Sequence, residues 1–110
     1  MMNLTGDFLR GHTDAVILSI LALGDNYGYR INQTIDEVSK GEFKLTEATL
    51  YTSFKRLESA GYIISYWQEV DMRKRKYYSI TELGLKYLED HTQGYFKMRN
   101  ILDQFYGGKL

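Results

Sequence analysis

The stretch "TEATLYTSFKRLESAGY", residues 46–62, decides the fold of this chain. Thr46 is a residue type that caps the start of helices, and Glu47 places a carboxylate where the positive end of a helix dipole favours it. Gly61 stands where a helix of this length is expected to end, because glycine readily adopts the backbone conformation that follows a last turn. We therefore predict a helix over about residues 47–60.

The predicted helix has two different faces. Leu50, Phe54 and Leu57 recur at spacings of four and three and form a stripe that faces a core. The opposite face carries small, hydroxylated and basic side chains, namely Ala48 or Thr49, Thr52, Lys55 and Arg56. Hydroxyl groups bond to bases or phosphates, and basic side chains pair with guanine or neutralise phosphate. The alternative is an ordinary solvated helix face.

A second stretch, "DMRKRKYY" at residues 71–78, contains the four consecutive cations Arg73, Lys74, Arg75 and Lys76. The segments "YIISYWQEV" before it and "KYYSIT" at its end are rich in β-branched and aromatic residues, which predicts a hairpin with "DMRKR" at its tip. Like charges on a turn repel one another, and a polyanion would relieve that repulsion. The alternative is a solvated turn whose cations protect an exposed strand edge.

Two further helices are predicted before residue 46. The segment "TDAVILSILAL", residues 13–23, carries apolar residues at helical spacing up to Leu23, begins with the possible caps Thr13 or Asp14, and is followed by Gly24. After the turn "GDNYG" we expect a short amphipathic helix from residue 29, with an apolar side formed by Ile31, Ile35 and Val38.

A long helix is predicted from Glu82 to about Tyr106, with apolar or aromatic positions at heptad-like spacing. Such a helix extends about 37 Å, and most of it cannot lie against its own small domain. A second copy of the chain would cover the exposed stripe. The predicted dimerisation residues are Leu88, Tyr95, Met98, Leu102 and Phe105. The alternative is that the helix folds back onto residues 13–23 and completes a monomeric core.

The element order of three helices, two strands and a long helix predicts a mainly α fold with a small β-hairpin. It is the order of a winged helix-turn-helix, in which one helix enters the DNA major groove and the hairpin reaches the backbone or the minor groove. We predict a DNA-binding domain over residues 1–81 and a C-terminal dimerisation helix over residues 82–110.

A binding site for a flat apolar compound is predicted near the middle of the long helix. Gly94 removes side-chain volume there, and aromatic and methionine side chains around a gap accommodate planar ligands. The candidate ligand-binding residues are His91, Tyr95, Phe96 and Met98. The alternative is that Tyr95 and Met98 fill the core of the dimer.

Composition excludes several classes of function. The chain has 110 residues, no cysteine and zero net charge, but residues 44–78 carry seven basic and four acidic side chains, which favours a local anionic partner. His12 and His91 lack ligand-spaced neighbours, so we expect no metal, no cofactor and no catalytic residues. The start "MMNLTGDFLRG" does not read as a leader and no segment reads as a membrane span, so we expect a cytoplasmic protein.

The motifs "LSILALGDNYGYRI", "ATLYTSFKRLESAGYI" and "RKYYSITELG" closely resemble those of the PadR family of bacterial transcriptional regulators. The resemblance covers nearly the whole chain, and the length is similar to that of the short branch, which includes the lactococcal multidrug-resistance regulator. It implies a homodimeric winged-helix repressor that binds an inverted-repeat operator.

The resemblance also implies which residues contact DNA, and these are Thr49, Tyr51, Thr52, Lys55, Arg56, Arg73, Lys74, Arg75 and Lys76. Tyr51 has the alternative of packing under its helix. In the lactococcal relative an aromatic-lined pore between subunits receives planar drugs, and the position of its central aromatic falls at Tyr95. Two other functions stay open, a winged-helix module that binds an acidic protein and a regulator of the MarR type.

Overall fold

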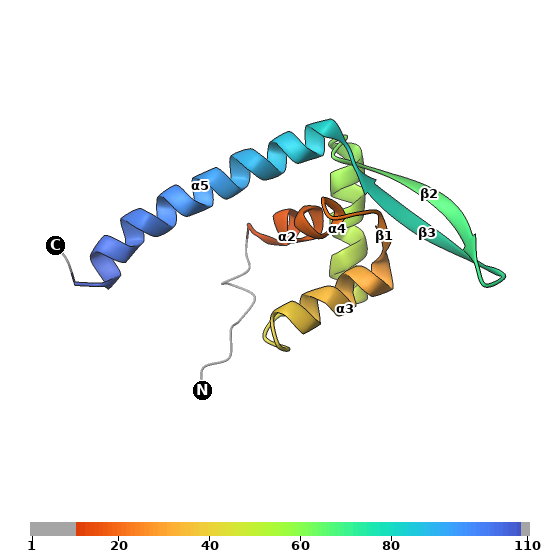
Figure 1. The fold of residues 1–110 in the computed structure, drawn as a ribbon, viewed down its shortest axis with the longest axis horizontal. Coiled ribbons are helices and arrows are strands. Elements are labelled where there is room, and N and C mark those ends of the chain that lie inside the picture. Colours follow the sequence, from red (N-terminus) through yellow and green to blue (C-terminus); the bar gives the residue numbers. More distant parts are fainter. Residues whose placement is uncertain (1–10, 109–110) are drawn as a thin grey trace.

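The computed structural model describes residues 11–108. Helices α2, α3 and α4 lie together in the middle, the hairpin of β2 and β3 extends to one side, and α5 extends to the other (Figure 1). The elements are α2 (Thr13–Leu21), β1 (Asn26–Tyr27), α3 (Gly28–Val38), α4 (Glu47–Ser59), β2 (Ile63–Val70), β3 (Arg73–Ile80) and α5 (Glu82–Tyr106). The predicted winged helix-turn-helix with a long C-terminal helix is therefore confirmed. The start of the chain and the outer limits of the two predicted parts lie outside the described residues.

The core forms where the apolar stripe of α4 meets α2, α3 and the sheet. Leu50, Phe54 and Leu57 are 2%, 1% and 1% exposed, as their spacing predicts. The ring of Phe54 stacks on that of Tyr78 in β3, with centroids 3.9 Å apart. Burial raises the pKa of Tyr78 to about 12, so this phenol stays neutral in its apolar surroundings.

The ends of α4 and the start of α5 are fixed by side-chain and backbone caps. The Thr46 hydroxyl accepts a hydrogen bond from the Thr49 N–H at 3.1 Å, which confirms the predicted cap. Gly61 follows α4 with a φ of 80°, a conformation that glycine adopts without strain. The Thr81 hydroxyl accepts from the Gly84 N–H and donates to the Gly61 carbonyl at 2.7 Å. Thr81 therefore ties the start of α5 to the end of α4.

Two helix boundaries differ from the prediction. Helix α2 ends at Leu21 because the chain must turn there to reach the sheet, which leaves Leu23 92% exposed. His12, and not Thr13 or Asp14, occupies its N-terminal cap position. Val38 is 79% exposed because it is the last residue of α3, beyond the core contacts of Ile31 and Ile35.

The sheet has three strands in the order β1–β3–β2. The sequence analysis missed β1, which is a two-residue strand that pairs Asn26 with Tyr78 and Tyr27 with Tyr77. It also placed the basic residues on a turn, and this was wrong. The turn consists of Asp71 and Met72, which both have positive φ angles as in a two-residue hairpin loop, and the cations lie within β3.

Candidate nucleic-acid interface

The exposed face of α4 is the first part of the candidate interface. Thr49, Tyr51, Thr52 and Lys55 are all exposed. Lys55 makes no ion pair within residues 11–108, so its charge is available to a ligand. Tyr51 is 47% exposed but also packs edge-on against Phe54, with ring centroids 5.7 Å apart. Both predicted alternatives for Tyr51 therefore hold in part, since one side of its ring is packed and the other is open.

A close approach between α3 and α4 sets the position of Tyr51. A Cβ atom on the buried Gly28 would lie 3.4 Å from the Tyr51 hydroxyl and 3.5 Å from the Phe54 ring. Only a residue without a side chain leaves room for this contact at no cost. The first residues of α3 and α4 thus line one shared groove of about 520 Å³, which also includes Tyr29 and Lys44. The sequence analysis did not identify these two residues.

The strands of the wing, β2 and β3, separate the four cations into two pairs. Side chains alternate between the faces of a strand. Lys74 and Lys76 lie on the face of Tyr78, which is the face that α4 covers, and the Lys76 ammonium lies 5.8 Å from the Tyr78 ring. Arg73 and Arg75 lie on the opposite face, where the Arg75 guanidinium lies 4.5 Å from the ring of Tyr27. A ligand held by α4 would therefore meet the two lysines first.

Trp67 belongs to the same face as the two lysines. It is directly opposite Lys76 in the register of β2 and β3, and it is 65% exposed. An exposed indole beside an ammonium group suits contact with a nucleic-acid backbone or base. The sequence analysis used this tryptophan only as part of a family motif. Its strand period would have placed it correctly once the position of the turn was known.

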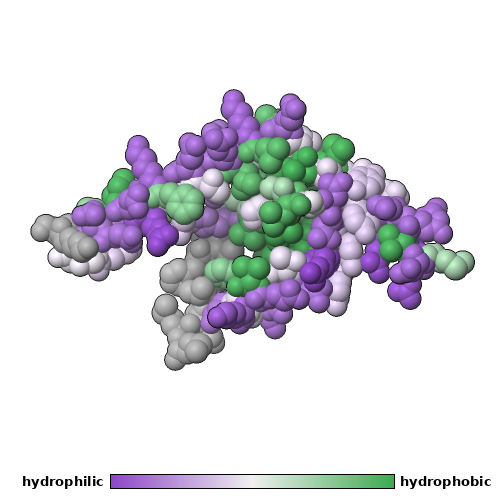
Figure 2. Space-filling model, viewed as in Figure 1, coloured by the Kyte–Doolittle hydropathy of each residue, from purple (hydrophilic) through white to green (hydrophobic). Residues whose placement is uncertain are grey.

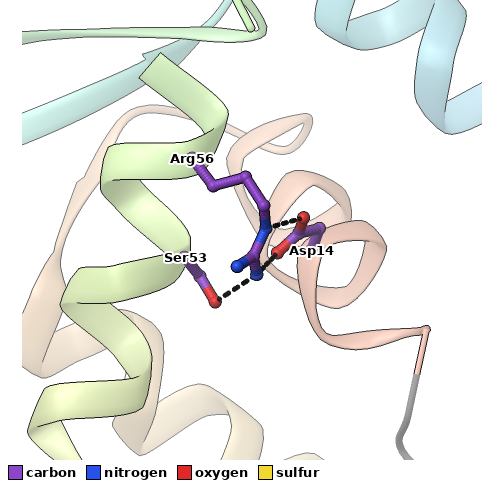
Figure 3. Close-up of polar contacts among 3 residues, drawn as sticks. All are labelled: Asp14, Ser53 and Arg56. Atoms are coloured by element: carbon purple, nitrogen blue, oxygen red, sulfur yellow. Dashed lines mark hydrogen bonds and ion pairs between the residues drawn. The ribbon is translucent and has the colours of Figure 1, made fainter. Parts of the chain in front are cut away.

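Arg56 differs from the other predicted contacts because its guanidinium is already bound within the protein. Its Nε donates to Oδ2 of Asp14 at 2.8 Å, and its Nη2 donates to Oδ1 at 2.6 Å (Figure 3). Nη2 also donates to the hydroxyl of Ser53 at 3.1 Å. The hydrogen bond to Asp14 raises the pKa of Arg56 further. Asp14 is 42 residues away in the sequence, so residue spacing gave no signal of this pair.

Helix α5 combines a packed inner part with an exposed outer part. Its inner part lies along α2, and Leu88 packs against the core cluster of its own chain. The expectation that most of α5 stands away from its own domain is therefore wrong for this inner part, and Leu88 is not a free dimer contact. In Figure 2 the broad apolar area covers the middle of the molecule, whereas the outer part of α5 shows separate apolar residues among hydrophilic ones. The exposed apolar residues of this outer part are Tyr95, Phe96, Met98, Ile101, Phe105 and Tyr106.

A hollow of about 360 Å³ lies between α5 and the start of α2. Its lining residues are Gly11, His12, Asp90, His91, Gly94, Tyr95 and Met98. Three of the four predicted ligand-binding residues are thus brought together, and Phe96 is not among them. The expectation that His12 and His91 are isolated is wrong, because Nδ1 of His12 lies 3.2 Å from Nε2 of His91. The Tyr95 ring also contacts His12 edge-on, at 5.5 Å between centroids.

Two searches of residues 11–108 bear on other classes of function. Within this range no three His, Asp or Glu side chains come close enough together to hold a metal ion. None of the helices in the same range is both long enough and apolar enough to cross a membrane.

Comparison with known proteins gives consistent matches. Residues 17–90 match the transcriptional regulator PadR-like family. An uncharacterized protein of Lysinibacillus sphaericus is 42% identical over 103 residues, which cover 93% of this chain and 94% of that protein. The solved structure of a transcriptional regulator from Clostridium thermocellum is 38% identical with a TM-score of 0.83, and the match covers 90% of this chain and 97% of that one. A PadR family transcription regulator from Clostridium difficile is 36% identical, with a TM-score of 0.77 and coverage of 87% and 99%.

Proposed function

This chain belongs to the transcriptional regulator PadR-like family, and from this membership we propose that it is a homodimeric repressor that binds an inverted-repeat operator. Proteins of this family are transcriptional regulators that bind DNA, and they are not enzymes. The observation that carries the proposal is that the open face of α4, with its unpaired Lys55, lies on the same side of the sheet as Lys74 and Lys76. Two elements thus offer cations to one polyanion.

The proposed DNA contacts have different weights. Thr49, Thr52 and Lys55 would contact base edges and phosphates from α4, and Tyr51 would add its exposed edge. From the wing, Lys74 and Lys76 would contribute most, because Arg73 and Arg75 point away from α4. Residues 1–81 would form the DNA-binding part and residues 82–110 the dimerisation part. Because DNA is the partner, the proposal places the protein in the cytoplasm.

Selection from a pool of random duplexes tests the proposal. We expect enrichment of an inverted repeat that binds roughly 10³-fold or more tightly than an unrelated duplex. The promoter upstream of the protein's own gene is the first natural sequence to titrate. Fluorescence of Trp67, the only tryptophan, should report binding because this side chain is exposed beside Lys76. Binding without any enriched sequence would contradict the proposal and favour the alternative of a module that binds an acidic protein.

Replacement of Lys55 or Lys76 by alanine should weaken operator binding by about 1–3 kcal/mol for a base contact, or reduce the slope of log K against log salt by about one for a phosphate contact. The matched control is Lys97→Ala, which removes the same charge from an exposed position on α5. Fluorescence titrations at several salt concentrations measure both quantities. Equal losses in all three variants would show a general charge effect and would contradict the assigned interface.

The dimer is proposed because the outer part of α5 exposes a row of apolar side chains. A two-fold pair of chains would cover this row and present two copies of α4 about 34 Å apart, one turn of DNA. Members of the family that act as MarR-type regulators are not considered further, since residues 17–90 match the PadR-like model.

The hollow beside α5 is the proposed site of an effector, as in the short branch of the family that the sequence resembles. A planar aromatic cation would fit it, because Tyr95 offers a ring and Asp90 a carboxylate. Binding there would alter the angle of α5 and relieve repression.

Titration of the dimer with a planar acridine dye tests this site. We expect a shift of the dye spectrum and about tenfold weaker binding in Tyr95→Ala, because an aromatic contact is lost. Phe96→Ala is the matched control, since Phe96 is the next residue on α5 but lies outside the hollow. Light scattering confirms that both variants remain dimers. An unchanged dye spectrum at high protein concentration, or equal losses in both variants, would exclude the site.

A further inference from the structure

Arg56 has its charged group directed at α2 and not at solvent alone, although the family resemblance places it among the DNA contacts. We propose that Arg56 is a positioning residue, which holds the recognition helix α4 against α2 through Asp14 and supports operator binding without touching DNA. The inference rests on the proposed function, because it assigns a role within DNA binding.

The hydrogen bonds of Arg56 leave no free edge for a phosphate. An arginine binds a phosphate or carboxylate in a bidentate manner through one of two edges of its guanidinium, Nε with Nη2 or Nη1 with Nη2. Asp14 occupies the first edge with bonds of 2.8 and 2.6 Å. The second edge shares Nη2, which also donates to Ser53 at 3.1 Å. Only Nη1 remains without a partner in the described part of the chain.

The charge of Arg56 is also balanced. The carboxylate of Asp14 is only 19% exposed, so the ion pair is partly shielded from water and from salt. A phosphate that approaches the pair meets a group with no net charge. Lys55, the neighbouring residue on α4, is exposed and has no such partner among residues 11–108. The two adjacent cations therefore have different roles.

The pair joins the points at which three helices meet. Asp14 lies in the first turn of α2, directly after the cap residue His12, which contacts His91 of α5 at 3.2 Å. At the other end, Ser53 is 1% exposed and adjoins the core residue Phe54. Arg56 therefore fixes α4 to the end of α2 that also contacts α5. In the dimer this contact would help set the distance between the two copies of α4.

The two roles of Arg56 predict opposite effects of removing Asp14. If Arg56 contacted phosphate, Asp14→Ala would free its charge and remove an anion, and operator affinity would rise. If Arg56 positions α4, Asp14→Ala should lower operator affinity about tenfold, as Arg56→Ala should. Neither variant should change the slope of log K against log salt, whereas Lys55→Ala, measured in parallel, should reduce it by about one if it loses a phosphate contact.

Exchange of the two charges gives a second test that does not depend on loss alone. The double variant Asp14→Arg with Arg56→Asp should bind the operator more tightly than Arg56→Asp alone, because the ion pair is restored in reverse. No such recovery, a rise in affinity for Asp14→Ala, or a reduced salt slope for Arg56→Ala would overturn the proposal. Circular dichroism melting of each variant confirms that it is folded at the assay temperature.

Failure of the inference can be distinguished from failure of the proposed function. If the wild-type chain selects no operator, the proposed function fails, and the role of Arg56 in DNA binding falls with it. If the wild type binds its operator and the Asp14 variant binds equally well or better, only the positioning role is excluded.

Discussion

Replacement of Gly84 by alanine is expected to lower the free energy of unfolding by about 3 kcal/mol or more. Gly84 is the third residue of α5 and is buried against the end of the DNA-binding part of the chain. A Cβ atom there would overlap the backbone carbonyl oxygen of Tyr62 and would lie 2.8 Å from Cγ1 of Ile80. The Tyr62 carbonyl accepts a hydrogen bond from the Thr81 N–H at 3.0 Å, so it cannot turn away without losing that bond. Urea or thermal unfolding followed by circular dichroism measures the effect.

Gly94→Ala is the matched control for this variant. It adds the same methyl group to the same helix, at a position where no atom lies within 4 Å of the new carbon. Because alanine favours helix more than glycine does, we expect unchanged stability or a gain of up to about 1 kcal/mol. Equal losses in the two variants would show that close packing at Gly84 is not the reason for the glycine.

Local signals in the sequence were sufficient to predict α4 and its role. Thr46, Gly61 and the stripe of Leu50, Phe54 and Leu57 act within one helix, and each lies where it was predicted. Strand β1 could not be predicted in the same way. It has two residues and exists only because Tyr27 pairs with Tyr77, fifty residues further along the chain.

The position of the wing cations required the exact location of a turn. With a broad basic tip, all four cations appear equivalent. A turn at Asp71 and Met72 instead places each of them in the register of β3, and the period of two then assigns Lys74 and Lys76 to the face of α4. A sequence alone rarely fixes a turn to the residue, and one residue of error reverses every side chain.

The partner of Arg56 was out of reach for a different reason. An ion pair between Asp14 and Arg56 depends on how α2 crosses α4, which follows from the packing of the whole core. An exposed arginine on a predicted recognition helix reads as a DNA contact until that crossing is known.

Replacement of Phe105 by aspartate is expected to convert the protein to a monomer and to weaken operator binding by a factor on the order of 10² to 10⁴, because the second half-site is no longer bound by a linked partner. Phe105 is 58% exposed and lies near the end of α5, beyond Leu88, the last α5 residue that packs against the core cluster. The fold of each chain should therefore persist. Its loss of apolar contact and its new charge would act only on the surface between two copies.

The control is Asn100→Asp, which introduces a carboxylate on the same helix but about half a turn away from Met98 and Leu102. It should leave both mass and affinity unchanged. Light scattering gives the mass, and titration with the selected operator gives the affinity. A Phe105→Asp variant that stays dimeric would place the interface elsewhere. One that becomes monomeric but binds the operator as tightly as the wild type would show that dimerisation does not drive DNA recognition, because tight binding by one copy of α4 and one wing would then account for the whole affinity.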